Sequence, residues 1–214
     1  MARRTKDEAE KTRSAIIDAA EKVFFAHGVT RSSLELVAKE AGVTRGAVYW
    51  HFKNKPALLH AMAQRIILPH EDMLEKLAAQ MSQTPIDDLR SVCIHTLKTM
   101  AKDKRRRHVL TILFMRCEYI EEMFDIIKRQ NASKNRIVSL AEKLFSRAKD
   151  LKMLAPFWTP RQAAVAMEAL IIGLILGWLE QPKRTNLATV GASCVEAFFI
   201  SLKAEPSSYV LSES

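Results

Sequence analysis

Apolar residues recur at helical spacing in two short segments on either side of Gly42. The segment before this glycine has the i, i+3, i+4, i+7 pattern of one buried helical face, and the segment after it repeats that pattern. The residues concerned are Leu34, Val37, Ala38 and Ala41, followed by Val43, Ala47, Val48 and Phe52. The pattern predicts two short helices that meet at a sharp turn.

Gly42 and Thr44 have the properties expected at such a turn. A glycine just past a helix end can adopt the left-handed backbone conformation that redirects the chain, and threonine is a favourable N-cap for the next helix. A helix over 44–51 is too short to be stable alone, so neighbouring helices must hold it by one face. Its other face is then free, as in a helix-turn-helix unit that reads DNA. An ordinary helical hairpin with a solvated polar face is the alternative.

The free face of this second helix carries groups that contact DNA. Arg45 can bind guanine O6 and N7 bidentately, Gly46 leaves room for close approach, and Tyr49 can pack on a thymine methyl or donate to phosphate. His51 and Lys55 are expected to anchor the phosphate backbone, which sets register without reading sequence. Double-stranded DNA is therefore the expected partner.

A wider pattern in the first fifty-odd residues includes the run AGVTRGAVYWHFKNK, preceded by Thr12, Arg13, Ile16, Ala19, Ala20, Phe24, Gly28, Thr30, Ser33 and Leu34. This pattern resembles the DNA-binding domain of the TetR family of bacterial transcriptional regulators. The segments RRTKDEAEKTR and RCEYIEEM are similar to the branch of AcrR and TtgR, local repressors of multidrug efflux-pump operons. In that family the helix matching 44–51 enters the major groove. The expected DNA-binding residues are Ser33, Thr44, Arg45, Gly46, Tyr49, Trp50, His51 and Lys55.

The composition favours an all-α protein with a polyanionic partner. Only six glycines and seven prolines occur in a chain of 214 residues that is dominated by long segments of helical periodicity. The formal net charge is +9, and residues 1–55 hold eleven Lys or Arg against seven Asp or Glu. This surplus suits a DNA-binding domain, although solvated basic faces are common.

Cysteine spacing and the N-terminal segment bear on redox chemistry and location. Cys93, Cys117 and Cys194 are widely spaced without a CxxC pair, so buried, inert thiols are expected in preference to a disulfide, a zinc site or a redox sensor. Met1 is followed by a charged stretch, which argues against a signal peptide and for a cytoplasmic protein. No nucleophile with its base, phosphate loop or metal-ligand spacing indicates an enzyme, so no cofactor and no metal are expected.

Helices are predicted along most of the chain. The first is expected over 6–27, and the second is expected to be capped by Ser32, with Glu35 completing a capping box. Asn54 is expected to cap a fourth helix that ends or kinks near Pro69. Later helices are expected over 85–101, 105–117, 118–150, 160–180 and 187–203. The predicted organisation is a three-helix DNA-binding domain over 1–54, a larger helical ligand-binding and dimerisation domain over 55–205, and a disordered tail over 206–214.

The segment 163–179, AAVAMEALIIGLILGWL, is apolar almost all round. It is at the short limit for a membrane span and contains Glu168, so a helix covered by protein on every side is the better interpretation. Small residues at four-residue spacing let another helix approach, which predicts a homodimer; the family resemblance implies the same arrangement. The expected interface residues are Ala169, Gly173, Gly177, Trp178, Val190, Cys194, Ala197, Phe198 and Ser201.

The rest of the second domain is expected to enclose an apolar, methionine-rich pocket for a hydrophobic small molecule of the drug or phenolic class. Relatives carry polar groups at positions matching Ile172 and Leu176, where this chain is aliphatic, so larger apolar ligands are favoured. Plain core packing is the alternative for each of these residues. The expected lining residues are Ile66, His70, Met73, Leu89, Val92, Thr96, Leu110, Leu113, Phe114, Asn135, Val138, Met167, Glu168, Ile171, Ile172 and Ile175.

The basic run over 102–107 allows two interpretations. It can add DNA contacts, or it can cover a helix end or touch the DNA-binding domain and so couple the two domains. The whole pattern predicts a dimeric, ligand-responsive repressor of a palindromic operator, and the resemblance implies that this operator controls an efflux-pump operon. Nonspecific architectural DNA binding and activation of another operon are the rival functions.

Overall fold

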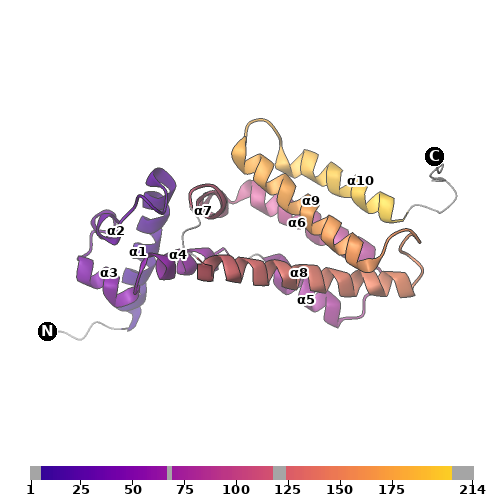
Figure 1. Cartoon of the computed structure of the whole chain (residues 1–214), viewed down its shortest axis with the longest axis horizontal. Helices are drawn as coiled ribbons and strands as arrows, with labels where there is room; N and C mark the ends of the chain where they lie inside the picture. The colour runs from indigo at the N-terminus through magenta and orange to yellow at the C-terminus, as the bar shows by residue number, and fades with distance from the viewer. Residues whose placement is uncertain (1–5, 67–68, 118–123, 204–214) are drawn as a thin grey trace. The chain divides into compact units, whose positions relative to one another are not determined.

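The computed structural model describes residues 6–66, 69–117 and 124–203, and every regular element in these residues is helical. The chain forms two compact units, each built from two segments (Figure 1). Unit 1 consists of Met1–Ile67 and Lys104–Gln130, and unit 2 consists of Leu68–Asp103 and Asn131–Ser214. The fold class predicted from the sequence, an all-α protein, is confirmed.

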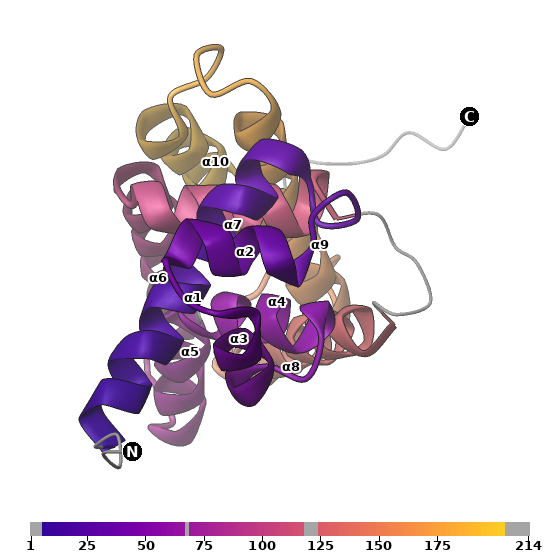
Figure 2. The same ribbon diagram turned by 90° about the vertical axis from the view of Figure 1, so that its left-hand side faces the viewer.

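Unit 1 is a bundle around one long helix, α1 (Lys6–His27). The short helices α2 (Leu34–Ala41) and α3 (Arg45–His51) pack on it, as do α4 (Lys55–Gln64) and α7 (Lys104–Met115). Figure 2 shows α2 and α3 side by side with α1 next to both. The helices meet through residues that are fully buried, among them Ile16, Phe24, Val37, Val48 and Leu58. The apolar faces predicted from residue spacing therefore form this core.

The turn between α2 and α3 forms for the predicted reasons. Gly42 has a φ of 65° in the left-handed region, and its N–H bonds back to carbonyls of the last turn of α2. Thr44 caps α3, because its side chain accepts a hydrogen bond from the Ala47 N–H at 3.2 Å. Asn54 caps α4 in the same way through the Ala57 N–H at 2.9 Å.

The start of α2 differs by one residue from the prediction. Ser33 is the N-cap and accepts from the Leu36 N–H at 3.1 Å, whereas the hydroxyl of the buried Ser32 donates to the Gly28 carbonyl at 2.6 Å. The predicted capping box between Ser32 and Glu35 is therefore wrong. Glu35 lies one position earlier in the helix than that motif requires, and its carboxylate is available for another partner.

Unit 2 packs three long helices together, α6 (Pro85–Lys102), α9 (Pro160–Glu180) and α10 (Ala192–Leu202), with a π-helical turn at Leu187–Gly191 before α10 (Figure 1). The predicted capping box of α9 is present at Thr159 and Gln162. Helix α5 (Pro69–Ala79) packs on α6, and α8 (Phe124–Asp150) is joined to α9 by the Arg161–Glu142 ion pair at 3.0 Å. Phe145 and Phe199 stack in the core with ring centroids 6.5 Å apart.

One predicted boundary changes in the structure. Pro69 begins a separate helix, α5, after α4 has ended at Gln64, where the sequence predicted only an end or a kink. The predicted start of the long helix, over 118–123, and the tail over 206–214 lie outside the described residues.

Candidate nucleic-acid interface

Helix α3 is attached to unit 1 by one face and presents the other to solvent. Val48 is fully buried, whereas Arg45, Tyr49 and Trp50 on the opposite side are exposed, and Trp50 retains 74% of its accessible surface. Exposed tryptophan on a short, well-capped helix is unusual in a protein surface and is typical of a binding face. Most of the predicted DNA-binding residues share this exposed side; they are Ser33, Thr44, Arg45, Gly46, Tyr49 and Trp50, with His51 half-buried beside them.

The guanidinium of Arg45 is held from two sides. Its Nε lies 2.9 Å from Oε1 of Glu35 on α2, and its Cζ lies 5.3 Å from the ring centroid of Tyr49, one turn further along α3. Hydrogen bonds from the backbone N–H of Glu35 and from Ser33, together with the charge of Arg45, lower the pKa of the Glu35 carboxyl. Glu35 was missed in the sequence because it lies ten positions away on another helix.

Lys55 has a different environment from the one predicted. Its Nζ donates to the carbonyls of Val29, Thr30 and Ser32 at 2.9, 3.1 and 2.9 Å. An ammonium group has three N–H donors, so all three are used within unit 1. The structure places Lys55 as a clamp on the loop between α1 and α2, where the sequence suggested an anchor for DNA phosphate.

The basic run contacts α1 through Arg105. Its guanidinium lies 2.7 Å from Oε1 of Glu21 and 2.5 Å from Oδ1 of Asp18, and the same Asp18 oxygen lies 2.6 Å from Arg65. The hydrogen bond to Glu21 is the main reason why the pKa of Arg105 is raised. The interpretation in which this run touches the DNA-binding part of the chain is confirmed for Arg105.

An apolar face of unit 2 is uncovered within the chain. On α9, Val165, Ala169, Gly173 and Gly177 follow one another at four-residue spacing and are all exposed. A Cβ built on either glycine would meet no heavy atom within 4 Å. Glycine inside a helix costs roughly 0.5–1 kcal/mol relative to alanine, and no contact with the described residues requires it at these two positions.

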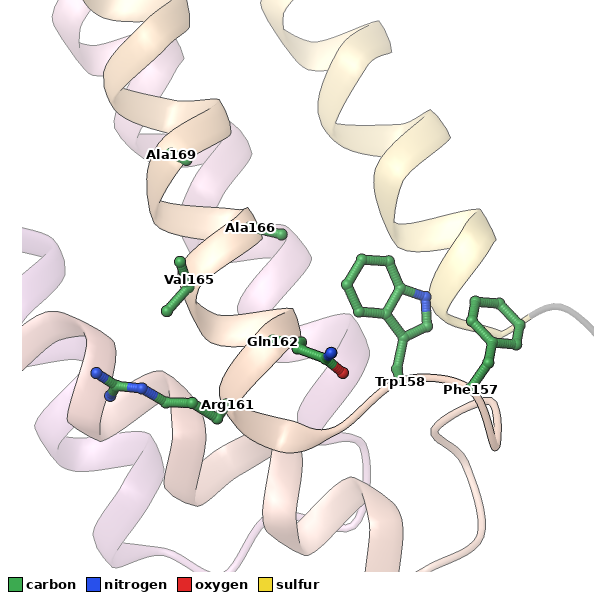
Figure 3. A pocket seen from close by; sticks show the side chains of 7 residues that line it. All are labelled: Phe157, Trp158, Arg161, Gln162, Val165, Ala166 and Ala169. Carbon is green, nitrogen blue, oxygen red and sulfur yellow. The ribbon is translucent and has the colours of Figure 1, made fainter.

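A hollow of about 570 Å³ continues this face toward the start of α9 (Figure 3). The ring of Trp158 lies between α9 and α10 in that view, with its centroid 6.0 Å from that of Phe198. The π-helical turn before α10 adds the exposed Val190. Helix α10 adds Ala197 and Ile200, which are exposed, and Cys194, Phe198 and Ser201, which are half-buried. Trp178, predicted at the same interface, is instead buried within unit 2. The lining residues of the hollow are Phe157, Trp158, Arg161, Gln162, Val165, Ala166 and Ala169.

The predicted ligand-pocket residues are found in both units. In unit 1, Ile66, Leu110 and Leu113 are buried and Phe114 is partly exposed. In unit 2 the buried members are Leu89, Val92, Thr96, Val138, Met167, Glu168 and Ile175, and the half-buried ones are Met73, Ile171 and Ile172.

The polar members of that set differ in what they can offer a ligand. Thr96 donates its hydroxyl to the Val92 carbonyl at 2.8 Å, and Asn135 is exposed. Glu168 is buried and lies 3.2 Å from Lys134 Nζ. The side chain of His70 lies outside the described residues. Of these groups, the Glu168 carboxylate is the buried one with acceptor capacity left for an orienting hydrogen bond.

Comparison with known proteins decides the family. Residues 16–62 match the sequence model of the bacterial regulatory proteins of the tetR family, and residues 84–203 match that of the C-terminal region of MAATS-type transcriptional repressors. The chain belongs to the TetR family. It is a transcriptional regulator and not an enzyme.

Individual TetR-family relatives match over nearly the whole chain. The transcriptional repressor BepR of Brucella suis biovar 1 is 35% identical over 202 residues, which cover 94% of this chain and 97% of BepR. The crystal structure of NalD, the secondary repressor of the MexAB-OprM multidrug efflux pump in Pseudomonas aeruginosa, is 39% identical with a TM-score of 0.84, covering 92% of this chain and 98% of NalD. A complex of SmeT with triclosan is 34% identical with a TM-score of 0.79, covering 89% and 91%. SmeT is described as the repressor of the Stenotrophomonas maltophilia efflux pump SmeDEF.

One helix in the described residues, α9, is long and apolar enough to cross a membrane by length and composition. The same test is passed by core helices of other proteins. Helix α9 packs against α6 and α10, and its buried Glu168 is paired with Lys134. Its apolar character is consistent with packing between helices of unit 2 on one side and with the uncovered face described above on the other.

Proposed function

We propose that this TetR-family protein is a dimeric repressor of a multidrug efflux-pump operon. A dimer binds a palindromic operator through α3 of each subunit and leaves it when a hydrophobic small molecule binds the larger helical part of the chain. The protein acts in the cytoplasm, where its DNA is. NalD and SmeT are described as repressors of efflux pumps, and SmeT binds triclosan, which supports the operon type and the ligand class.

The exposed face of α3 is the observation that carries the DNA-binding part. Arg45, Tyr49 and Trp50 project from a helix whose ends and buried side are both fixed by unit 1. A helix held in this way can enter the major groove without losing its own structure. DNA contacts are assigned to Ser33, Thr44, Arg45, Gly46, Tyr49, Trp50 and His51.

Gly46 supports close approach of this helix to DNA. The nearest atom to a Cβ at this position is the Thr44 Oγ1 at 3.9 Å, so the chain itself has room for a side chain there. Alanine is a better helix residue than glycine by up to about 1 kcal/mol. The fold does not need glycine at position 46, but a DNA duplex that lies against this position would explain it.

The uncovered face of α9 and α10 supports the homodimer. Its small residues allow a second copy to approach closely, and the two glycines have no other explanation in the chain. Two reading helices on a two-fold axis then match two half-sites about one helical turn apart. The apolar pocket residues of unit 2 are proposed as lining for the ligand, and they include the adaptable methionines Met73 and Met167.

Binding to the upstream region of the gene tests the proposal. A labelled duplex of that region is titrated with protein, with and without triclosan as the probe ligand, beside a scrambled duplex of equal length. A regulator gives affinity for its site at least about 10³-fold above that for the scrambled duplex, and triclosan lowers only the specific binding. Similar affinities for the two duplexes, with a steep salt dependence, would show the architectural rival to be correct.

The Gly46→Ala variant tests whether DNA lies against α3, because it should change DNA affinity without lowering stability. It is expected to be as stable as the wild type or more stable, because Gly46 is helical and unhindered. Its operator affinity is expected to fall about tenfold, because the added methyl group occupies the space proposed for the duplex. Unchanged affinity in this variant would place the DNA on a different face.

A further inference from the structure

Glu35 presents a carboxylate on the same surface as the proposed DNA-reading helix. It follows the N-cap of α2, its side chain is 47% exposed, and the neighbouring Arg45 is 65% exposed. A carboxylate on a surface that meets a polyanion repels the phosphates and weakens binding to any sequence. A physical role that offsets this repulsion is therefore required, if α3 reads DNA.

The contact between Glu35 and Arg45 supplies such a role. An arginine side chain has four rotatable bonds, and a free guanidinium must lose this freedom before it can grip a base. In this structure Nε lies 2.9 Å from Glu35 Oε1 in an ion pair, and the Tyr49 ring lies 5.3 Å from Cζ on another side. The guanidinium is thus oriented before DNA arrives.

The atoms used in this contact leave the reading edge available. The contact between the two side chains is made by Nε, whereas four of the five guanidinium donors are on the two terminal nitrogens. Two parallel donors on terminal nitrogens are the group that fits guanine O6 and N7. Glu35 belongs to α2, so the ion pair lets α2 influence the orientation of a residue on α3.

We propose that Glu35 is a positioning residue that sets the base specificity of Arg45, at a cost in affinity for DNA in general. This inference rests on the proposed operator binding. It assigns discrimination at one base pair in each half-site to a pair of residues on two helices. The base recognised through this pair is a guanine, since a guanidinium offered end-on matches guanine and no other base edge.

The experiment compares charge-neutral variants at two glutamates of α2. Glu35→Gln removes the contact, and Glu40→Gln is the matched control, because Glu40 lies on the same helix and pairs with Lys22 at 3.1 Å. The probe is a duplex library with randomised half-sites, from which bound sequences are selected and sequenced. Affinities for the selected palindrome and for a scrambled duplex are then measured by fluorescence anisotropy, and circular dichroism checks that each variant is folded.

The expected signature separates positioning from simple electrostatics. Glu35→Gln lowers the ratio of specific to nonspecific affinity about tenfold and leaves nonspecific binding equal or tighter, whereas Glu40→Gln leaves the ratio unchanged. Glu35→Gln and Arg45→Ala lose discrimination at the same base pair, and the double variant is no worse than Arg45→Ala alone. Glu35→Asp, which keeps the carboxylate, retains more discrimination than Glu35→Gln.

Three other results would overturn the proposal. An unchanged ratio in Glu35→Gln, while Arg45→Ala loses discrimination, shows that Arg45 needs no positioning. Loss at a different base pair from Arg45→Ala shows that Glu35 reads a base itself. Equal losses in Glu35→Gln and Glu40→Gln show that only net charge matters. Failure of the proposed function gives a separate result, because the wild-type protein then selects no palindrome from the library.

Discussion

Replacing Lys55 by methionine distinguishes a residue that clamps a loop from one that anchors DNA. The sequence suggested a phosphate contact, but the ammonium group donates to the carbonyls of Val29, Thr30 and Ser32. Methionine keeps the length and apolar stem of the side chain and removes the charge with all three donors. The variant therefore tests the donors and changes little else.

The magnitude follows from the three hydrogen bonds. Bonds from a charged donor contribute about 1.5–3 kcal/mol each when fully buried, but these are only part-buried and water can replace some of them. We expect the free energy of unfolding to fall by about 2 kcal/mol. For a chain of this size, that corresponds to a melting temperature lower by about 4–8 °C.

Two measurements on the Lys55→Met protein check the prediction. Urea denaturation followed by circular dichroism gives the stability, with Lys53→Met as a control at an exposed lysine in the turn just before α4. The slope of log affinity against log salt, between about 50 and 200 mM, counts phosphate contacts at about 0.9 per contact. We expect this slope to stay the same in Lys55→Met. Unchanged stability together with a slope smaller by about 1.8 per dimer would refute the clamp and restore the phosphate anchor.

Four further outcomes are expected. Gly42→Ala destabilises the protein by about 1 kcal/mol in urea denaturation, because φ is 65° and no atom near the new Cβ offers a compensating contact. Burial raises the pKa of the Cys93 thiol from 9.0 to about 12, so Cys93 resists iodoacetamide in the folded protein and reacts with it in urea. Because the thiol of the unfolded chain loses its proton at a lower pH, the free energy of unfolding falls as the pH rises above 9.0. This fall is smaller in Cys93→Ala. Gly173→Arg yields a folded monomer in sedimentation velocity, whereas Ser139→Arg, at an exposed site on α8, stays dimeric. Arg105→Gln leaves stability within about 1 kcal/mol and operator affinity unchanged but alters release by triclosan, as seen in anisotropy titrations.

The sequence predicted those parts of the fold that depend on neighbouring residues. The caps Thr44, Asn54 and Thr159 lie where they were expected, because an N-cap needs only the correct residue type three positions before a free N–H. The buried faces of α1 to α4 also follow directly from helical spacing. The register error at Ser32 shows the limit of such rules. The motif favours Ser32, which has Glu35 three residues later, but the Ser32 hydroxyl donates to the Gly28 carbonyl and Ser33 becomes the N-cap.

Parts of the candidate site that depend on distant contacts could not be predicted. Lys55 lies 23 to 26 residues from the carbonyls that it binds, and the sequence does not show that they converge. Glu35 and Arg45 were each visible as charged residues, but their pairing depends on the angle between α2 and α3. Trp178 was expected at an interface because of its place in an apolar run, whereas the rotation of α9 turns it into the core of unit 2.

Asp18 is suited to link ligand binding to the position of α1, because one of its oxygens contacts both Arg65 and Arg105. One carboxylate oxygen lies within 2.6 Å of Arg65, just past the end of α4, and within 2.5 Å of Arg105, at the start of α7. Asp103 alone separates the end of α6 from the start of α7, so we expect a ligand that displaces α6 to act on Arg105 through the backbone. The Asp18–Arg105 pair is about half exposed, and an ion pair of this kind contributes only about 0–1 kcal/mol, so a ligand that favours one state by more than this can break it. Stronger contacts at this position would hold α1 in one orientation in both the DNA-bound and the ligand-bound state, and the protein could not respond.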